Sequence, residues 1–385
     1  MNRHFFLFVF IVLVITKSSF AQVDTSHLRI SLITCGVGEE VWETYGHTAI
    51  RVTDSVNGSD NVYNYGTFNA FEEGFELKFM KGKLLYYVSY YPYYLFLREY
   101  TEANRSVYEQ ELILDGKKKE NIFDFLRWNA EEEHKYYRYD FLYDNCATRV
   151  RDVFPKTFGN YFKFGQTLPL NSRMTFRQII NQYLYRKHFE RFGINLLLGS
   201  RIDKVMTNED AMFLPYFLRD GIGNATVKGQ KVAAEPVMIL DGSPHLPAGI
   251  NWAFLLTLSI AILTISGIVV PGLKPIGKIM SNLLLLVTGL LGCLMLFMWL
   301  GTDHEACRNN FNILWALPTN LLVAFMSKRR KDKYALIGIL LIMISLLLHV
   351  LKIQELPLLE LSPLILSLLF VYGMIYRRNK VKAMN

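Results

Sequence analysis

The sequence has little charge for its length, and it contains no internal repeat and no low-complexity segment. Asp, Glu, Lys and Arg make up 20% of the 385 residues, whereas hydrophobic residues make up 51%. A soluble protein of this size usually carries more charge, and a disordered chain carries fewer apolar residues. The composition therefore excludes a purely soluble cytosolic enzyme and a disordered protein.

Several catalytic and metal-binding motifs are also missing. Neither Gly-x-Ser-x-Gly, His-Glu-x-x-His nor Cys-x-x-Cys occurs, so the sequence supports neither a serine hydrolase of the nucleophile-elbow type nor a zinc site. The stretch Gly36-Val37-Gly38 lacks the third glycine of a dinucleotide fingerprint, and we interpret it as a turn. We expect neither a metal ion nor a soluble cofactor.

The formal net charge of +8 does not indicate a nucleic-acid-binding surface. Most of the excess lies in links or tails of the apolar C-terminal region, at Lys274, Lys278, Lys328, Arg329, Arg330, Lys331, Lys333, Arg377, Arg378, Lys380 and Lys382. The rest of the mature chain is net negative, so it has no excess of positive charge for a phosphate backbone. We exclude nucleic acid as a partner.

Residues 1–21 are predicted to be a signal peptide. Arg3 and His4 precede an apolar run at 5–15, and Ser19-Phe20-Ala21 is typical of a cleavage site before Gln22. The alternative is an uncleaved anchor, although the apolar run is short for a membrane span. In either case the domain that follows is exported. No cysteine stands at the cleavage point, so the protein is not itself a lipoprotein.

Residues 250–376 are predicted to form five membrane-spanning helices, followed by a cytoplasmic tail at 377–385. The apolar runs are 250–270, 281–300, 311–326, 334–351 and 356–376. The third contains Pro318 and the fifth contains Glu360 and Pro363, so both need protein neighbours. If the first run begins outside, all the positive residues named above are cytoplasmic. The soluble domain and the links 301–310 and 352–355 then share the periplasmic face of the bacterial inner membrane.

The region before the spans is predicted to be an α+β domain, with a catalytic core at 22–165 and a helical extension at 166–249. We expect strands at 28–35, 46–53, 61–68, 83–91, 107–114 and 139–143. Helices are expected at 95–104, 121–137, 147–154 and 175–192, and Thr207 with Asp210 opens another through a near capping box.

Cys146 and His47 are the strongest candidates for catalysis. Cys146 is predicted to open a helix, where backbone N–H groups and the helix dipole stabilise a thiolate and can hold an oxyanion. His47, on a predicted strand, would be its base, in a papain-like arrangement that is circularly permuted because histidine precedes cysteine. Asn64 is our first choice to orient the imidazole, and Asn145 the second. The alternative is a structural histidine and a Cys35–Cys146 disulfide.

The link at 302–310 is too polar for a passive turn. We predict that Asp303, His304 and Arg308 bind substrate, with Arg308 as a phosphate ligand. The alternative is a solvated loop followed by Trp315 as an interfacial anchor. In the last span, Glu360 either touches substrate or forms hydrogen bonds within the helices.

Four blocks of the sequence resemble a known family. They are Leu-Ile-Thr-Cys-Gly at 32–36, Tyr-Gly-His-Thr-Ala-Ile-Arg-Val at 45–52, Tyr-Asn-Tyr-Gly-Thr-Phe at 63–68 and Tyr-Asp-Asn-Cys-Ala-Thr-Arg at 143–149. They resemble the periplasmic domain of the Lnb-type lipoprotein N-acyltransferases, and the apolar runs resemble the membrane domain that accompanies it. The resemblance implies a permuted papain-like fold, related to NlpC/P60 and lecithin:retinol acyltransferase proteins, followed by an all-α transmembrane domain of five helices.

The resemblance also implies a reaction and its partners. A fatty-acyl chain would pass from a phospholipid, through a cysteine thioester, to the N-terminal diacylglyceryl-cysteine of a lipoprotein. One alternative is a membrane-anchored NlpC/P60-like peptidoglycan peptidase or amidase that uses the same Cys146 and His47. Another is a non-catalytic envelope factor with a Cys35–Cys146 bridge. Five spans are more than an anchor needs, which favours the lipid substrate.

Overall fold

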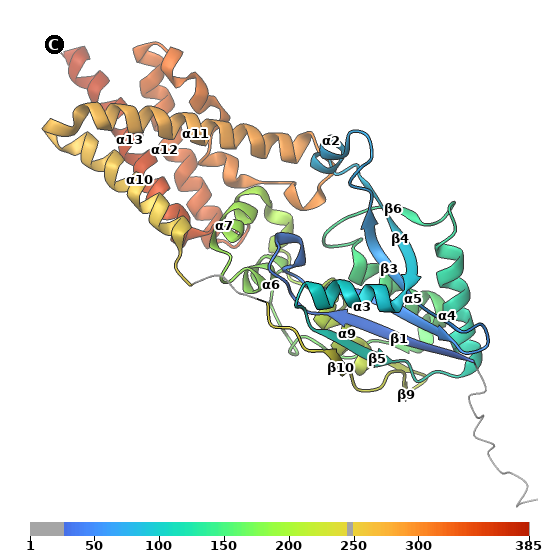
Figure 1. Ribbon diagram of the computed structural model, residues 1–385. Coiled ribbons are helices and arrows are strands. Elements are labelled where there is room, and N and C mark those ends of the chain that lie inside the picture. Colours follow the sequence, from blue (N-terminus) through green and yellow to red (C-terminus); the bar gives the residue numbers. More distant parts are fainter. Residues whose placement is uncertain (1–26, 245–248, 385) are drawn as a thin grey trace, which may run out of the picture.

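The computed structural model describes residues 27–244 and 249–384, which form two parts placed end to end (Figure 1). Residues 27–244 fold into an α+β part, and residues 249–384 fold into a helical part. The α+β class predicted for the first region is confirmed. The predicted signal peptide at 1–21 lies outside the described residues.

A seven-stranded antiparallel sheet, with strand order β10-β5-β1-β2-β3-β4-β6, is the centre of the α+β part. The strands are β1 (Leu28–Cys35), β2 (His47–Asp54), β3 (Ser59–Phe68), β4 (Leu85–Pro92), β5 (Val107–Glu111), β6 (Tyr136–Arg138) and β10 (Val237–Leu240). Along β1, Leu32 packs into the core on one face and Ile33 into the core on the other. The sheet is therefore buried on both faces. At one end of β1, Cys35 pairs with His47, the first residue of β2.

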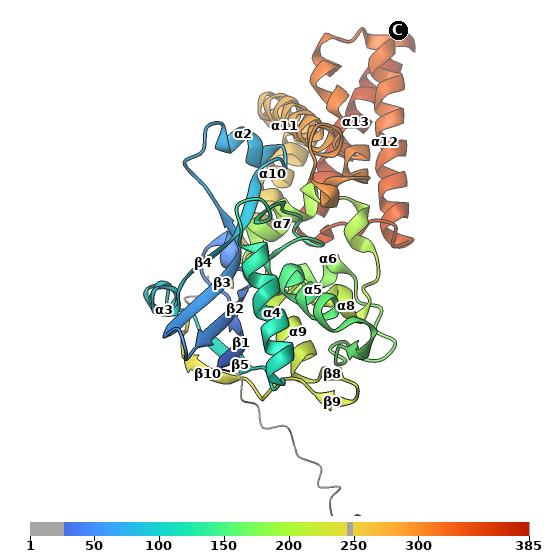
Figure 2. The same cartoon turned by 90° about the vertical axis from the view of Figure 1, so that its right-hand side faces the viewer.

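Helices cover both faces of this sheet (Figures 1 and 2). The helices α4 (Gly116–Asn129), α5 (Cys146–Phe158) and α9 (Pro215–Gly223) share a core with one face, and α3 (Tyr93–Glu102) packs on the other. A capping box starts α5: the Asn145 side chain accepts from the Thr148 backbone N–H, and the Thr148 hydroxyl accepts from the Asn145 N–H. This cap fixes Cys146 as the first residue of the helix.

Part of the extension predicted at 166–249 lies between the sheet and the helical part, whereas its later elements, α9 and β10, belong to the core and the sheet already described. The first part contains α6 (Phe176–Tyr183), α7 (His188–Leu197) and α8 (Asn208–Ala211), and Figure 1 shows α7 against the long helices. A small sheet of β7 (Phe162–Lys163), β8 (Thr226–Val227) and β9 (Gln230–Lys231) lies at the opposite end of the α+β part (Figure 2). The capping box predicted at Thr207 is present.

Three local predictions in this part are wrong. The helix expected at 175–192 is two helices, since α6 ends at Tyr183 and α7 begins at His188. The helix expected to reach residue 137 ends at Asn129. Residues 139–143 form a turn rather than a strand, since an Asp140 carboxylate oxygen accepts the backbone N–H groups of Leu142 and Tyr143. A short helix that the sequence analysis missed, α2 (Phe75–Met80), lies between β3 and β4.

Among the described residues, four helices are long and apolar enough to cross a membrane. They are α10 (Trp252–Val269), α11 (Lys274–Leu300), α12 (Lys328–Val350) and α13 (Leu358–Met384). A fifth long helix is not confirmed. The predicted third span, at 311–326, instead contains two 3-10 segments, η6 (Phe311–Leu314) and η7 (Pro318–Phe325). Pro318 explains the break, because it lacks the N–H that would continue a helix.

This non-α segment runs back along α11. Phe311 contacts Trp299 near the end of α11, Ala316 lies against Gly292, and Leu321 lies against Gly289. From Phe311 to Leu321 the segment follows ten residues of α11, from Trp299 to Gly289, which is about 15 Å along that helix. The segment therefore lies against the half of α11 that is nearer the α+β part.

Buried side chains supply the polar partners that such a segment needs inside a membrane. Asn320 of η7 is buried, its amide donates to the Thr288 hydroxyl, and its oxygen accepts from the hydroxyl groups of Tyr334 and Tyr372. Lipid cannot provide hydrogen bonds, so irregular backbone is tolerated only where protein surrounds it. The sequence predicted that the run containing Pro318 needs protein neighbours, and α11, α12 and α13 provide them through these three side chains.

The ends of the long helices agree with the charge pattern. Figure 1 shows the turn between α10 and α11 and the C-terminus at the end of the helical part farthest from the α+β part. Lys274 and Lys278 come directly after this turn, and the positive residues at 377–382 come directly before the C-terminus, so both groups lie at that end. The link at 301–310 lies at the other end, against the α+β part. This arrangement supports the predicted orientation, in which that link and the α+β part share one face of the membrane.

Candidate active site

Cys146, His47 and Asn64 come together at one end of the sheet. His47 is the first residue of β2, Asn64 lies on β3, and Cys146 is the first residue of α5. The Nε2 of His47 lies 2.6 Å from the Oδ1 of Asn64. The imidazole also forms a hydrogen bond with the Cys146 side chain. The three side chains thus form a row in which histidine stands between the amide and the thiol.

The electrostatics of the row favour a thiolate beside an imidazolium. Burial opposes ionisation of Cys146, but His47 and the backbone N–H groups of Thr48 and Ala147 lower the pKa of its thiol below the ordinary value. Burial likewise opposes protonation of His47, but the negative Cys146 and the hydrogen bonds to Cys146 and Asn64 raise the pKa of the imidazole overall. A larger fraction of Cys146 is therefore thiolate near neutral pH than of an ordinary cysteine.

The Asn64 side chain hydrogen-bonds to the imidazole of His47. Because its carbonyl oxygen faces Nε2, that nitrogen carries hydrogen, and Nδ1 is left to exchange a proton with the thiol. The amide nitrogen of Asn64 in turn donates to the Tyr91 hydroxyl at 3.3 Å, which donates to Glu99 at 3.4 Å. Asn145, the second choice, does not join the row: its side chain caps α5 and donates to the carbonyl groups of Phe141 and Phe213.

Cys35 lies close to the row but is not bonded to it. Both Cys35 and Cys146 are free thiols, so the disulfide considered from the sequence is not formed in this structure. Cys35 is completely buried, and burial raises the pKa of its thiol to about 12. Its thiol therefore stays protonated at neutral pH and offers no competing nucleophile.

The pH dependence of alkylation follows from these shifts. A thiol reacts as the thiolate, whose population grows as pH rises through the thiol pKa. Since the pKa of Cys146 is lowered, we expect iodoacetamide to alkylate it with a midpoint below that of an ordinary cysteine, whereas Cys35 stays unmodified across the neutral range. Peptide mass spectrometry at a series of pH values measures both sites in one sample. A midpoint for Cys146 at or above that of a free cysteine peptide would contradict the ion pair.

The outer link joins the two parts of the chain. The Asp303 backbone N–H donates to the Lys81 carbonyl at 2.9 Å, and the His304 Nε2–H donates to the Phe79 carbonyl at 3.2 Å. Asp303 also accepts from Arg138 at 3.3 Å. Arg308 pairs with Glu305 at 2.9 Å. None of these contacts reaches Cys146, so a substrate-binding role for Asp303, His304 and Arg308 stays a prediction.

The helical extension fits closely against the same link. The Gly199 N–H donates to the Ala306 carbonyl and the Ser200 N–H to the Asn309 carbonyl, at 2.9 and 3.1 Å. A Cβ on Gly199 would lie 2.0 Å from the Arg308 carbonyl oxygen, so only glycine permits this approach. The contact holds the α+β part at a set distance from the spans.

Two residues near the link have structural roles that the sequence left open. Trp315 is completely buried, and its indole N–H donates to Asn312, so it is not an interfacial anchor. Glu360 is also buried, and it accepts from Arg191 of α7 and from Asn251 before α10. Glu360 therefore ties the extension to the helical part.

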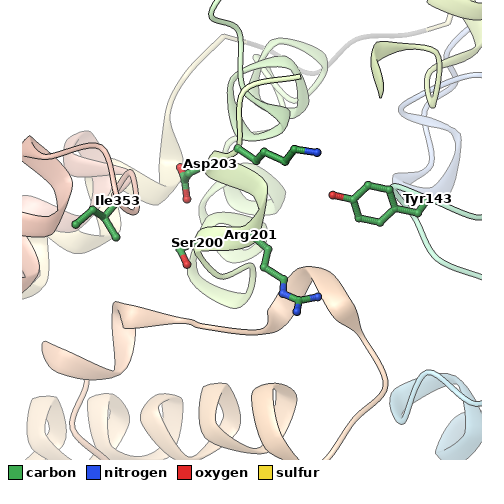
Figure 3. Close-up of a pocket in the computed structure, with 6 residues that line it drawn as sticks. Tyr143, Ser200, Arg201, Asp203 and Ile353 are labelled. Atoms are coloured by element: carbon green, nitrogen blue, oxygen red, sulfur yellow. The ribbon is translucent and has the colours of Figure 1, made fainter. Parts of the chain in front are cut away.

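An open cavity of about 390 Å³ lies where the extension meets the region before Cys146. It is lined by Tyr143, Ser200, Arg201, Asp203, Lys204 and Ile353, and Figure 3 shows Tyr143 on the side opposite Asp203 and Ile353. Each charged lining residue already has an ion-pair partner: Arg201 pairs with Glu305, Asp203 with Arg177, and Lys204 with Asp210. The sequence analysis did not single out this cavity. Within residues 27–244 and 249–384, no group of three His, Cys, Asp or Glu side chains could hold a metal ion.

Two family models match the chain. The model of the Lnb N-terminal periplasmic domain matches residues 16–186, which include all three members of the row. The model of the Lnb transmembrane domain matches residues 245–382. No curated protein and no solved structure matches the chain. The matches identify a multi-pass membrane protein with a periplasmic domain, in agreement with the family that the sequence blocks resemble.

Proposed function

Because the chain belongs to the Lnb family of lipoprotein-modifying membrane acyltransferases, we propose that it moves a fatty-acyl chain from a phospholipid to a lipoprotein through a thioester on Cys146. The observation that carries this proposal is the row of Cys146, His47 and Asn64 at the N-terminus of α5. A nucleophile, a base in contact with it and a group that orients the base are what acyl transfer requires.

The first half of the reaction acylates the enzyme. The Cys146 thiolate attacks the ester carbonyl carbon of the phospholipid and forms a C–S bond. The ester C–O bond then breaks, and protonated His47 gives its proton to the leaving lysophospholipid oxygen. Cys146 is left as a thioester, and His47 is left as a neutral base.

Backbone N–H groups stabilise the negative oxygen formed during this attack. Cys146 and Ala147 are the first two residues of α5, so their N–H groups have no carbonyl partner within the helix. The positive end of the helix dipole adds to the same effect. We assign the oxyanion to these groups, because donors aimed at a developing charge in a site away from water contribute strongly to rate.

The second half transfers the chain to nitrogen. The α-amine of a diacylglyceryl-cysteine attacks the thioester carbonyl, and His47 removes the proton that the amine loses. The C–S bond breaks, the amide is released, and the thiolate is restored beside the protonated imidazole. An α-amine has a typical pKa near 7.7–8.0, so a substantial fraction is neutral and nucleophilic near neutral pH.

Further parts of the proposal concern fold and location. Histidine precedes cysteine in the chain, so we assign the α+β part to a circularly permuted papain-like fold. The inner membrane is the proposed location, with the α+β part in the periplasm. We assign Arg308, with Asp303 and His304 beside it, to the phosphate of the lipid headgroup, because a guanidinium suits bidentate phosphate binding. The spanning helices favour lipid over peptidoglycan as the substrate.

Acylation in the absence of an acceptor tests the proposal. When purified protein is incubated with phospholipid alone, we expect the peptide that contains Cys146 to gain one fatty-acyl mass, removable by hydroxylamine. A synthetic diacylglyceryl-cysteine peptide should then discharge the adduct and become N-acylated. If no adduct or N-acyl product forms with any phospholipid, while muropeptides are cleaved in a Cys146-dependent way, the peptidase alternative replaces the acyltransferase.

A further inference from the structure

A row of aromatic rings connects α2 with the surroundings of Cys146. The members are Phe79 and Phe75 of α2, Phe68 at the end of β3, Tyr86 of β4, and Tyr139 after β6; we call them the aromatic track. Successive ring centroids lie 6.0, 5.8, 5.3 and 4.5 Å apart, so each ring contacts the next. The track is thus continuous from one end to the other.

One end of the track lies beside the nucleophile. Burial, and then the negative charge on Cys146, raise the pKa of Tyr139 well above its ordinary value. Tyr86, Tyr139 and Cys146 pack against the same core as partly buried side chains. A Cβ on Gly66, two residues before Phe68, would lie 3.7 Å from the Cβ of Cys146. The track therefore reaches Cys146 from the side of β3 and β6.

The other end of the track lies level with the outer ends of the spans. α2 is held there by the hydrogen bonds from Asp303 and His304, the residues that follow α11. Gly82 makes the close approach possible, since its φ is +68° and a Cβ would lie 3.2 Å from the Asp303 backbone. Figures 1 and 2 both show α2 beside the end of α11 that faces the α+β part.

The surface of α2 and its approach is apolar and exposed. Phe71 is 98% exposed, and Leu77, Phe79 and Met80 are about half exposed. Soluble domains rarely leave such a group uncovered without a binding role. Charged residues alternate with them in the chain: Glu72, Glu73 and Glu76 on one side of the balance, and Lys78, Lys81 and Lys83 on the other, with Lys78 paired to Glu72 at 3.0 Å. Lysine stems suit the boundary between acyl chains and phosphates. The occupant that fits both the position and the chemistry is the outer leaflet of the membrane.

We propose that α2 enters the outer leaflet and that the aromatic track holds the fatty-acyl chain of the phospholipid donor while its ester reaches Cys146. This inference rests on the proposed acyl transfer and adds the subsite for the acyl chain. The track is open along much of its length, as Phe68 is 43% and Phe79 53% exposed, so a chain can slide from the leaflet without entering a closed tunnel. Aromatic rings give such a chain apolar contact without a polar group to desolvate.

Photocrosslinking tests the position of the chain directly. The full-length Cys146→Ser protein, which forms no thioester, is placed in vesicles that contain a phospholipid with a diazirine near the ester end of one acyl chain. On illumination we expect labelled peptides from 68–80 and 86–91, in addition to those of the spans. Labelling of the spans alone would overturn the inference, whatever the outcome for acyl transfer.

Acylation rates give the second test. One track variant is the double substitution Phe75→Ser with Phe79→Ser, and the other is the single substitution Phe68→Ser. The matched control is Tyr161→Ser, because Tyr161 is an aromatic residue that is 63% exposed and lies beside the distant β7–β8–β9 sheet. Each methylene that loses apolar contact weakens binding, so we expect the track variants to lose about tenfold in Cys146 acylation by a long-chain phospholipid relative to acylation by a short-chain soluble ester. The single substitution Phe79→Leu keeps an apolar side chain, so this variant should retain most of the acylation rate with the long-chain phospholipid.

The two proposals fail in different ways. If the unmodified protein forms no acyl adduct with phospholipid, the proposed function is wrong. If it forms the adduct and the track variants keep the same ratio of long-chain to short-chain rates as Tyr161→Ser, the acyl-chain subsite is wrong. A track variant that loses both reactions is judged by the crosslinking result, which needs no catalysis.

Discussion

Cys146→Ser is expected to abolish transfer of the acyl chain to a lipopeptide, with a loss of roughly 10⁴-fold or more. A serine hydroxyl stays protonated at neutral pH even beside His47 and the N-terminus of α5, so the variant has no anionic nucleophile in place of the thiolate. Serine is nearly the same size as cysteine and suits the first turn of a helix, so folding and membrane insertion should be unchanged. Mass spectrometry of the N-acylated peptide measures activity, and thermal unfolding measures folding.

Cys35→Ala is the matched control. The Cys35 thiol is buried and its pKa is raised to about 12, so it takes no part as a nucleophile, and this variant should keep most of the activity. An equal loss in both variants, together with a Cys35–Cys146 peptide in the unreduced protein, would favour the structural bridge over catalysis.

His47→Ala has the second largest expected effect, a loss of about 10²- to 10⁴-fold in acylation of Cys146. Without the imidazole, Cys146 loses the leading favourable contribution that lowers its pKa, and burial then raises it. The leaving lysophospholipid oxygen also loses its proton donor. Two measurements follow: the rate of adduct formation should fall, and the alkylation midpoint of Cys146 should move to higher pH.

Asn64→Ala separates orientation from proton transfer. Asn64 acts through His47, so its loss should lower the acylation rate less than the loss of the histidine, and the alkylation midpoint should shift in the same direction by a smaller amount. A midpoint in His47→Ala equal to that of the unmodified protein would show that the imidazole does not act on Cys146.

Local pattern was enough to predict many of the elements. The alternation of apolar residues identified β1 with its observed ends, Leu28 and Cys35, and located four of the other six strands of the large sheet to within a few residues. It was less reliable where a side chain hydrogen-bonds to nearby backbone: the carboxylate of Asp140 makes a turn where a strand was expected. Propensity and periodicity do not register such a contact.

The membrane region shows the same limit. Length and hydropathy identified the four long helices, because crossing a bilayer demands a minimum apolar length of any isolated helix. The segment around Pro318 depends on other rules. The buried side chain of Asn320 in this segment hydrogen-bonds to Thr288 of α11, Tyr334 of α12 and Tyr372 of α13, and no local window contains them all.

The sequence by itself determined which residues can do chemistry: a cysteine at a helix start, a histidine on a strand and an amide on the next strand. Only the tertiary structure decided that they meet, because β2 pairs with β3 and α5 packs across both, which brings together residues far apart in the chain. It also decided what surrounds them. α2 and the aromatic track carry no local signature of function, since the role we propose for them depends on where the link after α11 holds them. Contacts between distant segments are set by packing of the whole chain, and that information is not contained in any short stretch of it.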